Sequence, residues 1–252
     1  MFEIFILSII QGVTEFLPIS SSSHLILVSE YFKFNNQNLS IDVSLHIGSF
    51  LAVIFFFKNE IFSFLKNREL FLKILISSIP VMITGYILVE YNLIEYLRNV
   101  KIIGWTTVIF GILLYFSDKF GKNNNIKENF NYKSAIIIGV FQVLSLIPGV
   151  SRSGISITAA RFLNFDRVDS VKISFLLSIP TLAAVSFFGI SSLLNSGNLE
   201  FSLLNIFSIF LSFIFSLITI KIFLRFTKKF NLNVFVFYRL VLGSIILFLA
   251  YL

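Results

Sequence analysis

Long apolar segments separated by short polar ones run through almost the whole chain. Six of these segments approach the roughly 20 residues that a helix needs to cross a bilayer. No stretch between them has the composition of a soluble domain. The pattern predicts an all-α polytopic membrane protein that forms a single integral membrane domain, residues 1–252. The predicted transmembrane spans are residues 42–57, 72–90, 102–117, 171–193, 203–226 and 235–252.

Four further apolar segments are too short to cross comfortably, and they form two pairs. A polar turn that contains proline separates the members of each pair, and polar residues 33–41 follow the first pair. Non-helical backbone is tolerated at membrane depth only where protein or a wet cavity surrounds it. Each pair therefore predicts a re-entrant helical hairpin that enters and leaves the membrane by the same face. The predicted hairpin helices are residues 4–17 and 23–32, then residues 134–147 and 152–163.

Both halves of the chain share one order of elements, a hairpin followed by three spans. A hairpin plus three crossings changes the side of the membrane an odd number of times, so the second half is predicted to be inverted. The predicted parts are repeat one (1–117), a polar cytoplasmic linker (118–133) and repeat two (134–252), with Ser78–Pro80 and Ser178–Pro180 as a weak local echo. Inverted repeats bind ligands near the midplane, where the two hairpins are predicted to meet.

The basic residues are divided unevenly between the two sets of loops that this layout creates. Cytoplasmic loops of membrane proteins carry an excess of lysine and arginine. This rule favours six spans and two hairpins, with both termini outside and the first hairpin open to the outside. The basic set of loops contains Lys58, Lys66, Arg68, Lys73, Lys119, Lys122, Lys127, Lys133, Arg161, Arg167, Lys172, Lys221, Arg225, Lys228 and Lys229. The opposite set contains Lys33, Arg98 and Lys101.

The composition agrees with this class and excludes several others. The chain is 56% hydrophobic and only 13% charged, whereas a soluble domain carries about 25% charged residues. It has no cysteine, which excludes disulfides, thiolate catalysis and cysteine-based metal sites. The net charge of +7 is scattered over short loops without a basic stripe, so no nucleic-acid partner is predicted.

The first predicted hairpin contains polar side chains inside one of the most hydrophobic parts of the chain. Gln11 and Glu15 are four residues apart, so they share one helix face. An ionisable side chain within a membrane is costly without a partner and indicates a functional site by default. The structural alternative is that Glu15 only forms an ion pair that locks two helices together.

Four consecutive serines follow the proline of the first turn. A single serine is enough to cap the second helix, whereas a helix N-terminus with several hydroxyls and free N–H groups also binds anions. The two interpretations are compatible. Ser21 is a candidate nucleophile, and Ser20 and Ser22 are candidate substrate-binding residues.

His24 lies three residues after Ser21 and is predicted to share a helix face with that hydroxyl. An imidazole there would act as a general acid or base, or would attack phosphorus directly. The alternative is a hydrogen-bonded packing histidine. His46, in a predicted span, is interpreted as a packing residue or a neighbour of the site.

The turn of the second predicted hairpin holds an arginine between two serines, Ser151 and Ser153. The guanidinium of Arg152 has a fixed fork of donors that matches phosphate oxygens. Its permanent charge needs an anion at membrane depth, either a substrate or, alternatively, Glu15 when no substrate is bound. Gly149 and Gly154 allow a close approach of the backbone at this turn.

Together the two turns supply a carboxylate, a base or nucleophile, an arginine and a cluster of hydroxyls. Phosphoryl transfer requires this combination of charge neutralisation, positioning and an activated nucleophile. The oxygens of Glu15 and Gln11 are also candidate ligands for a divalent cation, Mg²⁺ or Ca²⁺, both of which prefer oxygen.

At these residues the chain resembles the bacterial undecaprenyl-diphosphate phosphatase family, also called bacitracin-resistance proteins. The resemblance covers nearly the whole chain and is most specific at Gln11–His24, Pro148–Gly154 and Ser174–Pro180. It implies hydrolysis of undecaprenyl diphosphate at the outer face of the bacterial plasma (inner) membrane, which recycles the lipid carrier of cell-wall synthesis. It also implies an inverted-repeat fold with two re-entrant hairpins, and a divalent cation.

The resemblance also assigns roles, by motif position, to residues of this chain. The family's catalytic positions fall on Glu15, Ser21, His24 and Arg152, and its phosphate-side serines on Ser151 and Ser153. The chain departs from the family at Gln11, where many members have Glu, and at Ser23, where Gly is usual. The first departure leaves Glu15 as the only acidic candidate metal ligand in the motif.

Two functions other than phosphatase activity are compatible with parts of this pattern. A lipid-phosphate flippase or anion transporter also uses inverted repeats with broken helices, and Arg152 would bind the transported anion. An acid-phosphatase-like enzyme requires a histidine several residues after its Ser-Arg pair, and no histidine follows Arg152. The sequence leaves open whether Ser21 or His24 attacks, whether Glu15 is a base or a metal ligand, and whether the protein is a homodimer.

Overall fold

The computed structural model describes residues 1–32, 38–64, 68–120, 124–195 and 202–252. These residues form helices joined by turns, with no strand among them and one isolated bridge between Asn124 and Phe165. The predicted loop positions Lys33, Lys66 and Lys122 lie outside the described residues. The all-α class is therefore confirmed for the described part of the chain.

Within the described ranges, six helices are long and apolar enough to cross a membrane, in agreement with the six predicted spans. Polar residues before several predicted spans belong to the helices, so the observed helices begin earlier. The side chain of Asn38, for example, caps its helix by accepting a hydrogen bond from Ile41 N at 2.9 Å. The long helices are α3 (Leu39–Phe56), α5 (Arg68–Glu90), α7 (Val100–Lys119), α11 (Arg167–Asn195), α12 (Leu203–Thr227) and α13 (Asn233–Tyr251).

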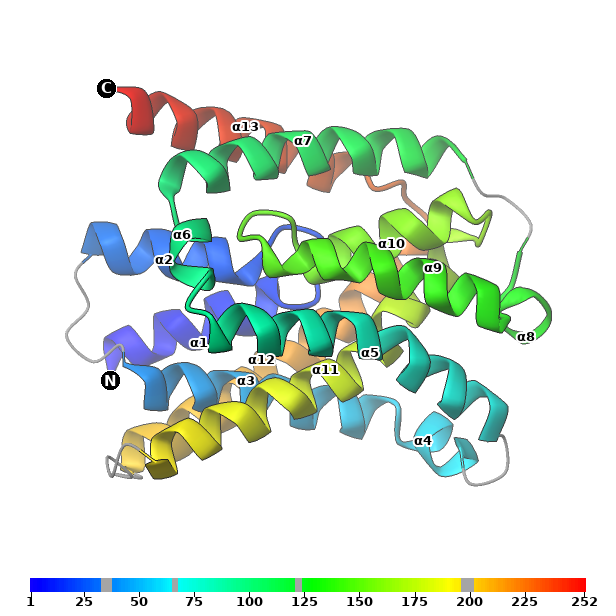
Figure 1. The fold of residues 1–252 in the computed structure, drawn as a ribbon, viewed down its shortest axis with the longest axis horizontal. Helices are drawn as coiled ribbons and strands as arrows, with labels where there is room; N and C mark the ends of the chain where they lie inside the picture. The colour runs from blue at the N-terminus through cyan, green and yellow to red at the C-terminus, as the bar shows by residue number, and fades with distance from the viewer. Residues whose placement is uncertain (33–37, 65–67, 121–123, 196–201) are drawn as a thin grey trace.

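Four shorter helices form the two predicted pairs. In Figure 1, α1 and α2 have their outer ends at the side where both termini lie, whereas α9 and α10 have theirs at the opposite side, near α8. The two turns therefore point toward each other in the middle of the molecule. The bounds are α1 (Phe2–Thr14), α2 (Ser21–Phe32), α9 (Tyr132–Val143), the 3₁₀ turn η1 (Leu144–Leu146) and α10 (Arg152–Phe162).

Three very short helices occupy segments that the sequence predicted as loops. They are α4 (Lys58–Phe64), α6 (Ile94–Leu97) and α8 (Ile126–Asn129). Parts of the predicted linker 118–133 are helical, because the end of α7, all of α8 and the first two residues of α9 lie within it. The first predicted helix is also shorter than expected, since the helix ends at Thr14 rather than at residue 17.

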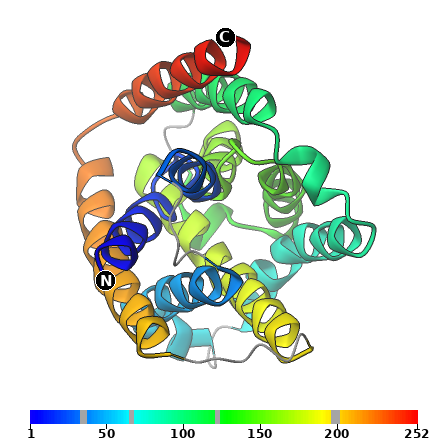
Figure 2. The same cartoon turned by 90° about the vertical axis from the view of Figure 1, so that its left-hand side faces the viewer.

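The packing interleaves the two halves of the chain. Helix α1 packs against α12 and helix α9 packs against α5, so each half supplies a long helix to the other half's hairpin. Helix α13 packs on α7, and α3 packs on both α11 and α12. Figure 2, viewed along the helices, shows the hairpin helices inside a ring of long ones. This arrangement surrounds both turns with protein.

The Ser-Ile-Pro echo does not relate equivalent helices. Pro80 lies in α5, the second long helix of the first half, and Pro180 lies in α11, the first long helix of the second half. In both cases the serine two residues earlier donates to a carbonyl of its own helix, from Ser78 to Ile74 and from Ser178 to Phe175. The similarity therefore reflects the same local hydrogen-bonding arrangement next to a proline within a helix, and not a repeat of the whole helix.

One buried ion cluster lies at the end of the molecule opposite the termini. Asp118 is only 6% exposed and accepts from Arg167 Nε at 2.8 Å and from Leu232 N at 3.2 Å. Arg161 Nε lies 3.3 Å from the same carboxylate. Asp118 thereby joins the end of α7 to the end of α10 and the start of α11. The sequence predicted a loop at Asp118 and Arg167 and gave no sign that their side chains meet.

Candidate functional site

The two hairpin turns have the same unusual backbone at the residue before their second helix. Ser20 and Ser151 both have φ of 72°, in the left-handed region that is uncommon for residues other than glycine. Ser151 Oγ accepts from Gly154 N at 3.1 Å and so caps α10. Ser20 Oγ lies 2.9 Å from Ser23 Oγ. Strained backbone of this kind is concentrated at functional sites.

The two turns touch each other through hydrogen bonds, as the sequence predicted. Arg152 Nη2 donates to Glu15 Oε1 at 2.8 Å, which forms a partly buried ion pair across the turns. Arg152 Nη1 also donates to Ser174 O at 3.2 Å, a contact with α11. Ser153 Oγ donates to Leu17 O at 2.6 Å. The ion-pair interpretation of Glu15 and Arg152 is thus correct for this structure.

Glu15 is the centre of a buried polar cluster. Its side chain has 6% exposure, and its second oxygen, Oε2, accepts from Ser21 Oγ at 2.8 Å and from Gln11 Nε2 at 3.1 Å. The Gln11 amide nitrogen also lies 3.0 Å from His46 Nδ1. Because an amide NH₂ only donates, His46 Nδ1 accepts here. His46 is therefore a neighbour of the site, as one of the two interpretations had it.

His24 lies in the same turn, but its hydrogen bonds lead elsewhere. Nδ1 is 2.6 Å from Ser20 O, and since a carbonyl only accepts, Nδ1 carries the proton. Nε2 is 2.6 Å from the Tyr238 hydroxyl, and the two rings stack with an interplanar angle of 10°. Among the described residues His24 forms no hydrogen bond with Ser21, Glu15 or Arg152. Both residues lie in α2, three positions apart as the sequence predicted, but no hydrogen bond joins them.

The four serines of the first turn have separate surroundings. Ser20 and Ser23 are buried against each other, whereas Ser21 is directed to Glu15. Ser22 is exposed, with its Oγ 3.4 Å from Ser20 Oγ. Ser22 is therefore the serine of this run with its hydroxyl most open to a ligand.

Arg239, on α13, was not assigned any role from the sequence. It is 1% exposed, and its hydrogen bonds with described residues all go to backbone carbonyls. From the first turn it contacts Pro18 O at 3.2 Å, and from the second Val150 O at 3.0 Å and Gly149 O at 2.8 Å. It also donates to Thr107 O at 3.1 Å on α7. One guanidinium thus holds both turns against α7 and α13.

The two glycines of the second turn make the close approaches that the sequence predicted, and the partners are protein groups. Gly149 has φ of 94°, and a Cβ there would clash with the Thr106 side chain. A Cβ on Gly154 would lie 3.0 Å from Arg239 Nη1. Both glycines make room for the neighbours that hold the turn.

The groups around Glu15 decide whether a divalent cation fits there. No group of three or more His, Cys, Asp or Glu side chains gathers anywhere in the part of the chain that the structure describes. Gln11 Oε1, however, is a buried oxygen without a hydrogen-bond partner among the described residues. A carboxylate, an amide oxygen and a hydroxyl are ligand types that Mg²⁺ or Ca²⁺ takes when substrate phosphates complete the shell. The Gln11 amide turns its nitrogen toward Glu15 in this structure, so it would have to rotate for Oε1 and Glu15 to hold one cation.

Comparisons with known proteins identify relatives over nearly the whole chain. The family model described as "Bacitracin resistance protein BacA" matches residues 4–245. A protein of Pelagibacter ubique (strain HTCC1062) named undecaprenyl-diphosphatase is 50% identical over 99% of this chain and 97% of its own length. Proteins of the same name from Aliivibrio salmonicida and Jannaschia sp. are 38% and 35% identical, over 98% and 100% of this chain and 97% and 99% of their own lengths. The chain therefore belongs to the BacA bacitracin-resistance family.

Proposed function

We propose that this protein hydrolyses undecaprenyl diphosphate to undecaprenyl phosphate and inorganic phosphate, recycling the lipid carrier of cell-wall synthesis and conferring bacitracin resistance. Its relatives bear the name undecaprenyl-diphosphatase. The observation that carries the proposal is the Glu15–Arg152 pair between two turns, with Ser21 Oγ hydrogen-bonded to the same carboxylate. The arrangement places the Arg152 guanidinium, which can bind phosphate, beside a Ser21 hydroxyl that Glu15 can activate.

Arg152 is assigned to the diphosphate. Its guanidinium is bound to Glu15 in this structure, and an incoming diphosphate offers more negative charge than a single carboxylate. Transfer of Arg152 to phosphate oxygens frees one oxygen of Glu15 and neutralises charge that develops during phosphoryl transfer. Glu15 is therefore the resting partner of Arg152 and, once released, the base of the reaction.

Ser21 is assigned as the nucleophile because its hydroxyl already donates to Glu15. Ser21 Oγ attacks the terminal phosphorus as its proton passes to Glu15. The new phosphorus–oxygen bond forms while the bond to the bridging oxygen breaks and undecaprenyl phosphate leaves. Water then displaces the Tyr238 hydroxyl from His24 Nε2 and attacks the phosphoserine with this nitrogen as base. Glu15 returns its proton to Ser21 Oγ, and inorganic phosphate leaves.

The remaining site residues receive two kinds of role. Ser22 is exposed at the start of α2 and is assigned to bind phosphate together with the free N–H groups of that helix end. The others act by fixing the shape of the turns, through the contacts described above, and so hold the substrate-binding surface. These residues are Gln11, Ser20, Ser151, Ser153, Gly149 and Gly154.

A divalent cation is proposed at Gln11 Oε1 and Glu15, where it would neutralise phosphate charge. The Gln11→Glu variant supplies a second carboxylate four residues from Glu15, so it should bind Mg²⁺ or Ca²⁺ more tightly. The shift of the unfolding midpoint on adding the cation should grow by several degrees relative to the unaltered protein. An equal shift in both proteins would contradict the assignment of Gln11.

The membrane arrangement is proposed from the order of the helices. We infer that α1–α2 and α9–α10 are re-entrant hairpins and that the two halves are inverted repeats, each hairpin packing on a long helix of the other half. In a bacterial plasma (inner) membrane, the positive-inside rule directs the end with both termini outward. The site would then open to the outer face. A homodimer remains a prediction.

The test is phosphate release from undecaprenyl diphosphate by the purified protein in detergent. Arg152→Ala and Glu15→Ala should abolish release while the proteins still elute as folded, single species. The observation that supports the alternative function, a lipid-phosphate flippase or anion transporter, is the interleaved packing of the two halves. Such a protein would release no phosphate in detergent, where transport is impossible, and would move the lipid in vesicles.

A further inference from the structure

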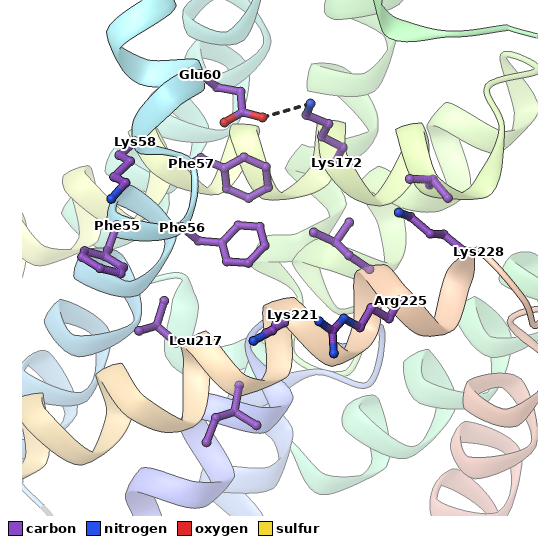
Figure 3. A pocket seen from close by; sticks show the side chains of 13 residues that line it. Phe55, Phe56, Phe57, Lys58, Glu60, Lys172, Leu217, Lys221, Arg225 and Lys228 are labelled. Atoms are coloured by element: carbon purple, nitrogen blue, oxygen red, sulfur yellow. Dashed lines mark ion pairs between the residues drawn. The ribbon is translucent and has the colours of Figure 1, made fainter.

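A cavity lies at the end of the molecule opposite the termini, between α3, α4, α11 and α12 (Figure 3). Its volume is about 780 Å³, within the range of roughly 300–1,000 Å³ that ligand sites occupy. None of the residues that line it belongs to the two hairpin turns. It is therefore separate from the proposed phosphatase site.

One side of this cavity is strongly cationic. Lys221 and Arg225 lie in the last two turns of α12 and Lys228 caps its end, and all three are exposed. Among the described residues none of the three forms an ion pair. Figure 3 shows these side chains along one edge of the cavity. Three cations without a carboxylate partner create a field that attracts an anion.

The opposite side supplies two further cations and the single acidic residue of the lining. Lys172 Nζ lies 3.1 Å from Glu60 Oε1, so these two charges neutralise each other. Lys58 Nζ lies 5.1 Å from the centre of the Phe55 ring. The lining as a whole keeps an excess of positive charge that the protein itself does not compensate.

Between the cations the walls are apolar. Phe57 is 2% exposed and forms part of the floor with Phe56 and Leu217, and Leu224 extends it along α12. In Figure 3 the rings of Phe56 and Phe57 lie centrally in the cavity. A free inorganic anion gains nothing from such a floor, whereas an acyl chain buries apolar surface against it.

The cavity also lies where a lipid would reach it. It is at the ends of membrane-spanning helices, on the side of the molecule with the basic loops, and exposed Phe55 and Ile218 flank it. Basic pockets between transmembrane helices on the cytoplasmic side bind the headgroups of anionic lipids. The location, the charge and the apolar floor all agree with one occupant.

We propose that this cavity binds one anionic phospholipid of the adjacent leaflet, with its phosphate at Lys221, Arg225 and Lys228 and an acyl chain over Phe56 and Leu217, which are only partly buried. The lipid thereby joins α12 to α3 and α11. The proposal does not depend on the phosphatase activity. The positive-inside orientation would make the adjacent leaflet the cytoplasmic one, and the lipid site itself does not depend on that orientation.

The experiment compares two lipids that differ only in the headgroup. The detergent-purified protein is titrated with dioleoyl phosphatidylglycerol or dioleoyl phosphatidylcholine, and bound lipid is counted by native mass spectrometry. We expect one molecule of phosphatidylglycerol to bind in preference to phosphatidylcholine. Lys221→Gln, Arg225→Gln and Lys228→Gln together should weaken that binding roughly 100-fold, at about 1 kcal/mol for each cation near a membrane surface.

A matched triple variant controls for the loss of charge. Lys127→Gln, Lys133→Gln and Lys229→Gln remove three exposed cations from the same end of the molecule, outside the cavity, and should leave binding within about twofold of the unaltered protein. The unfolding midpoint in lipid-free detergent checks that both triple variants fold.

Three results would overturn the proposal. Equal losses in the two triple variants would mean that surface charge in general, rather than this cavity, attracts the lipid. Equal binding of the two lipids would exclude recognition of the anionic headgroup. Displacement of phosphatidylglycerol by millimolar inorganic phosphate would identify a site for the free anion instead of a lipid.

Discussion

The two hairpins have nearly the same backbone and carry opposite halves of the chemistry. Each has a short helix, a turn that ends in a serine at φ of 72°, and a second helix that starts at the next residue. With Ser20 aligned on Ser151, the two glutamines coincide, whereas Glu15, His24 and Arg152 each face an uncharged residue in the other hairpin. The aligned pairs are Gln11 and Gln142, Glu15 and Leu146, Ser21 and Arg152, and His24 and Ile155.

This difference teaches that the site is a property of the pair and not of either hairpin. The first hairpin brings the carboxylate, the hydroxyl and the imidazole, whereas the second brings the guanidinium. Among the residues that the structure describes, neither Glu15 nor Arg152 has a charged partner within its own hairpin, so each depends on the other turn. Four kinds of substitution should separate these contributions. They change the Glu15–Arg152 ion pair, the Arg239 guanidinium that supports both turns, the backbone at Gly149, and the buried amide of Gln142.

The largest effect is expected from removing one member of the ion pair. Arg152→Gln should abolish phosphate release and should also destabilise the fold by about 3–5 kcal/mol, because Glu15 stays buried without its counter-ion. The double variant Glu15→Gln, Arg152→Gln should recover much of the stability without recovering activity. Thermal unfolding and phosphate release measure the two effects separately. A double variant less stable than Arg152→Gln would contradict this account.

A large effect is also expected from the support that the two hairpins share. Arg239→Met keeps the length of the side chain but leaves carbonyls of Pro18, Gly149 and Val150 without their donor. Each unpaired buried acceptor costs about 1–3 kcal/mol, so the protein should unfold at a much lower temperature. Arg239→Lys should be partly rescued, because an ammonium still donates to two or three carbonyls. Equal midpoints for the Met and Lys variants would show that packing, not hydrogen bonding, matters here.

The backbone geometry of the second turn can be tested at Gly149. Gly149→Ala combines left-handed strain of about 1–3 kcal/mol with a clash against Thr106, so both stability and phosphate release should fall. Gly85→Ala is the matched control, because a Cβ there would only approach Leu146 at 3.4 Å. That variant should behave like the unaltered protein. A Gly149→Ala protein with normal stability would mean that the turn relaxes easily.

The smallest effect is expected at the amide of the second hairpin. Gln142 is fully buried, and neither its oxygen nor its nitrogen has a hydrogen-bond partner among the described residues. Gln142→Met should therefore raise the unfolding free energy by about 1–2 kcal/mol and leave phosphate release unchanged. Gln11→Met, in the first hairpin, should instead lower activity by removing a donor to Glu15. Similar behaviour of the two variants would mean that the hairpins are less different than proposed.

The sequence predicted the main elements because hydropathy alone defines them. The six spans and the two short pairs follow from the lengths of the apolar segments, and the contact between Glu15 and Arg152 follows from the cost of isolated charges in a membrane. No role could be predicted for Arg239, because its partners are backbone carbonyls. Every residue has a backbone carbonyl, so the sequence does not show which ones an arginine will bind. Asp118 was taken as part of a polar linker, since sequence does not reveal that Arg161 and Arg167 enclose it.

His24 marks a second limit of prediction from sequence. Helical spacing correctly indicated that His24 and Ser21 are near neighbours, but it could not predict which hydroxyl the imidazole would choose. Tyr238 lies 214 positions away along the chain and belongs to a helix that the motif does not include. Only the packing of α13 beside the first turn brings these rings together.

The contact between Arg239 and Pro18 joins residues that are 221 positions apart. During synthesis, the first hairpin therefore leaves the ribosome long before the guanidinium that secures it. Until α13 is inserted, the carbonyls of both turns lack their common donor, and the half-built centre is open to lipid and water. Chains interrupted before this helix should be recognised as unfinished and degraded, so the cell would contain complete molecules or none.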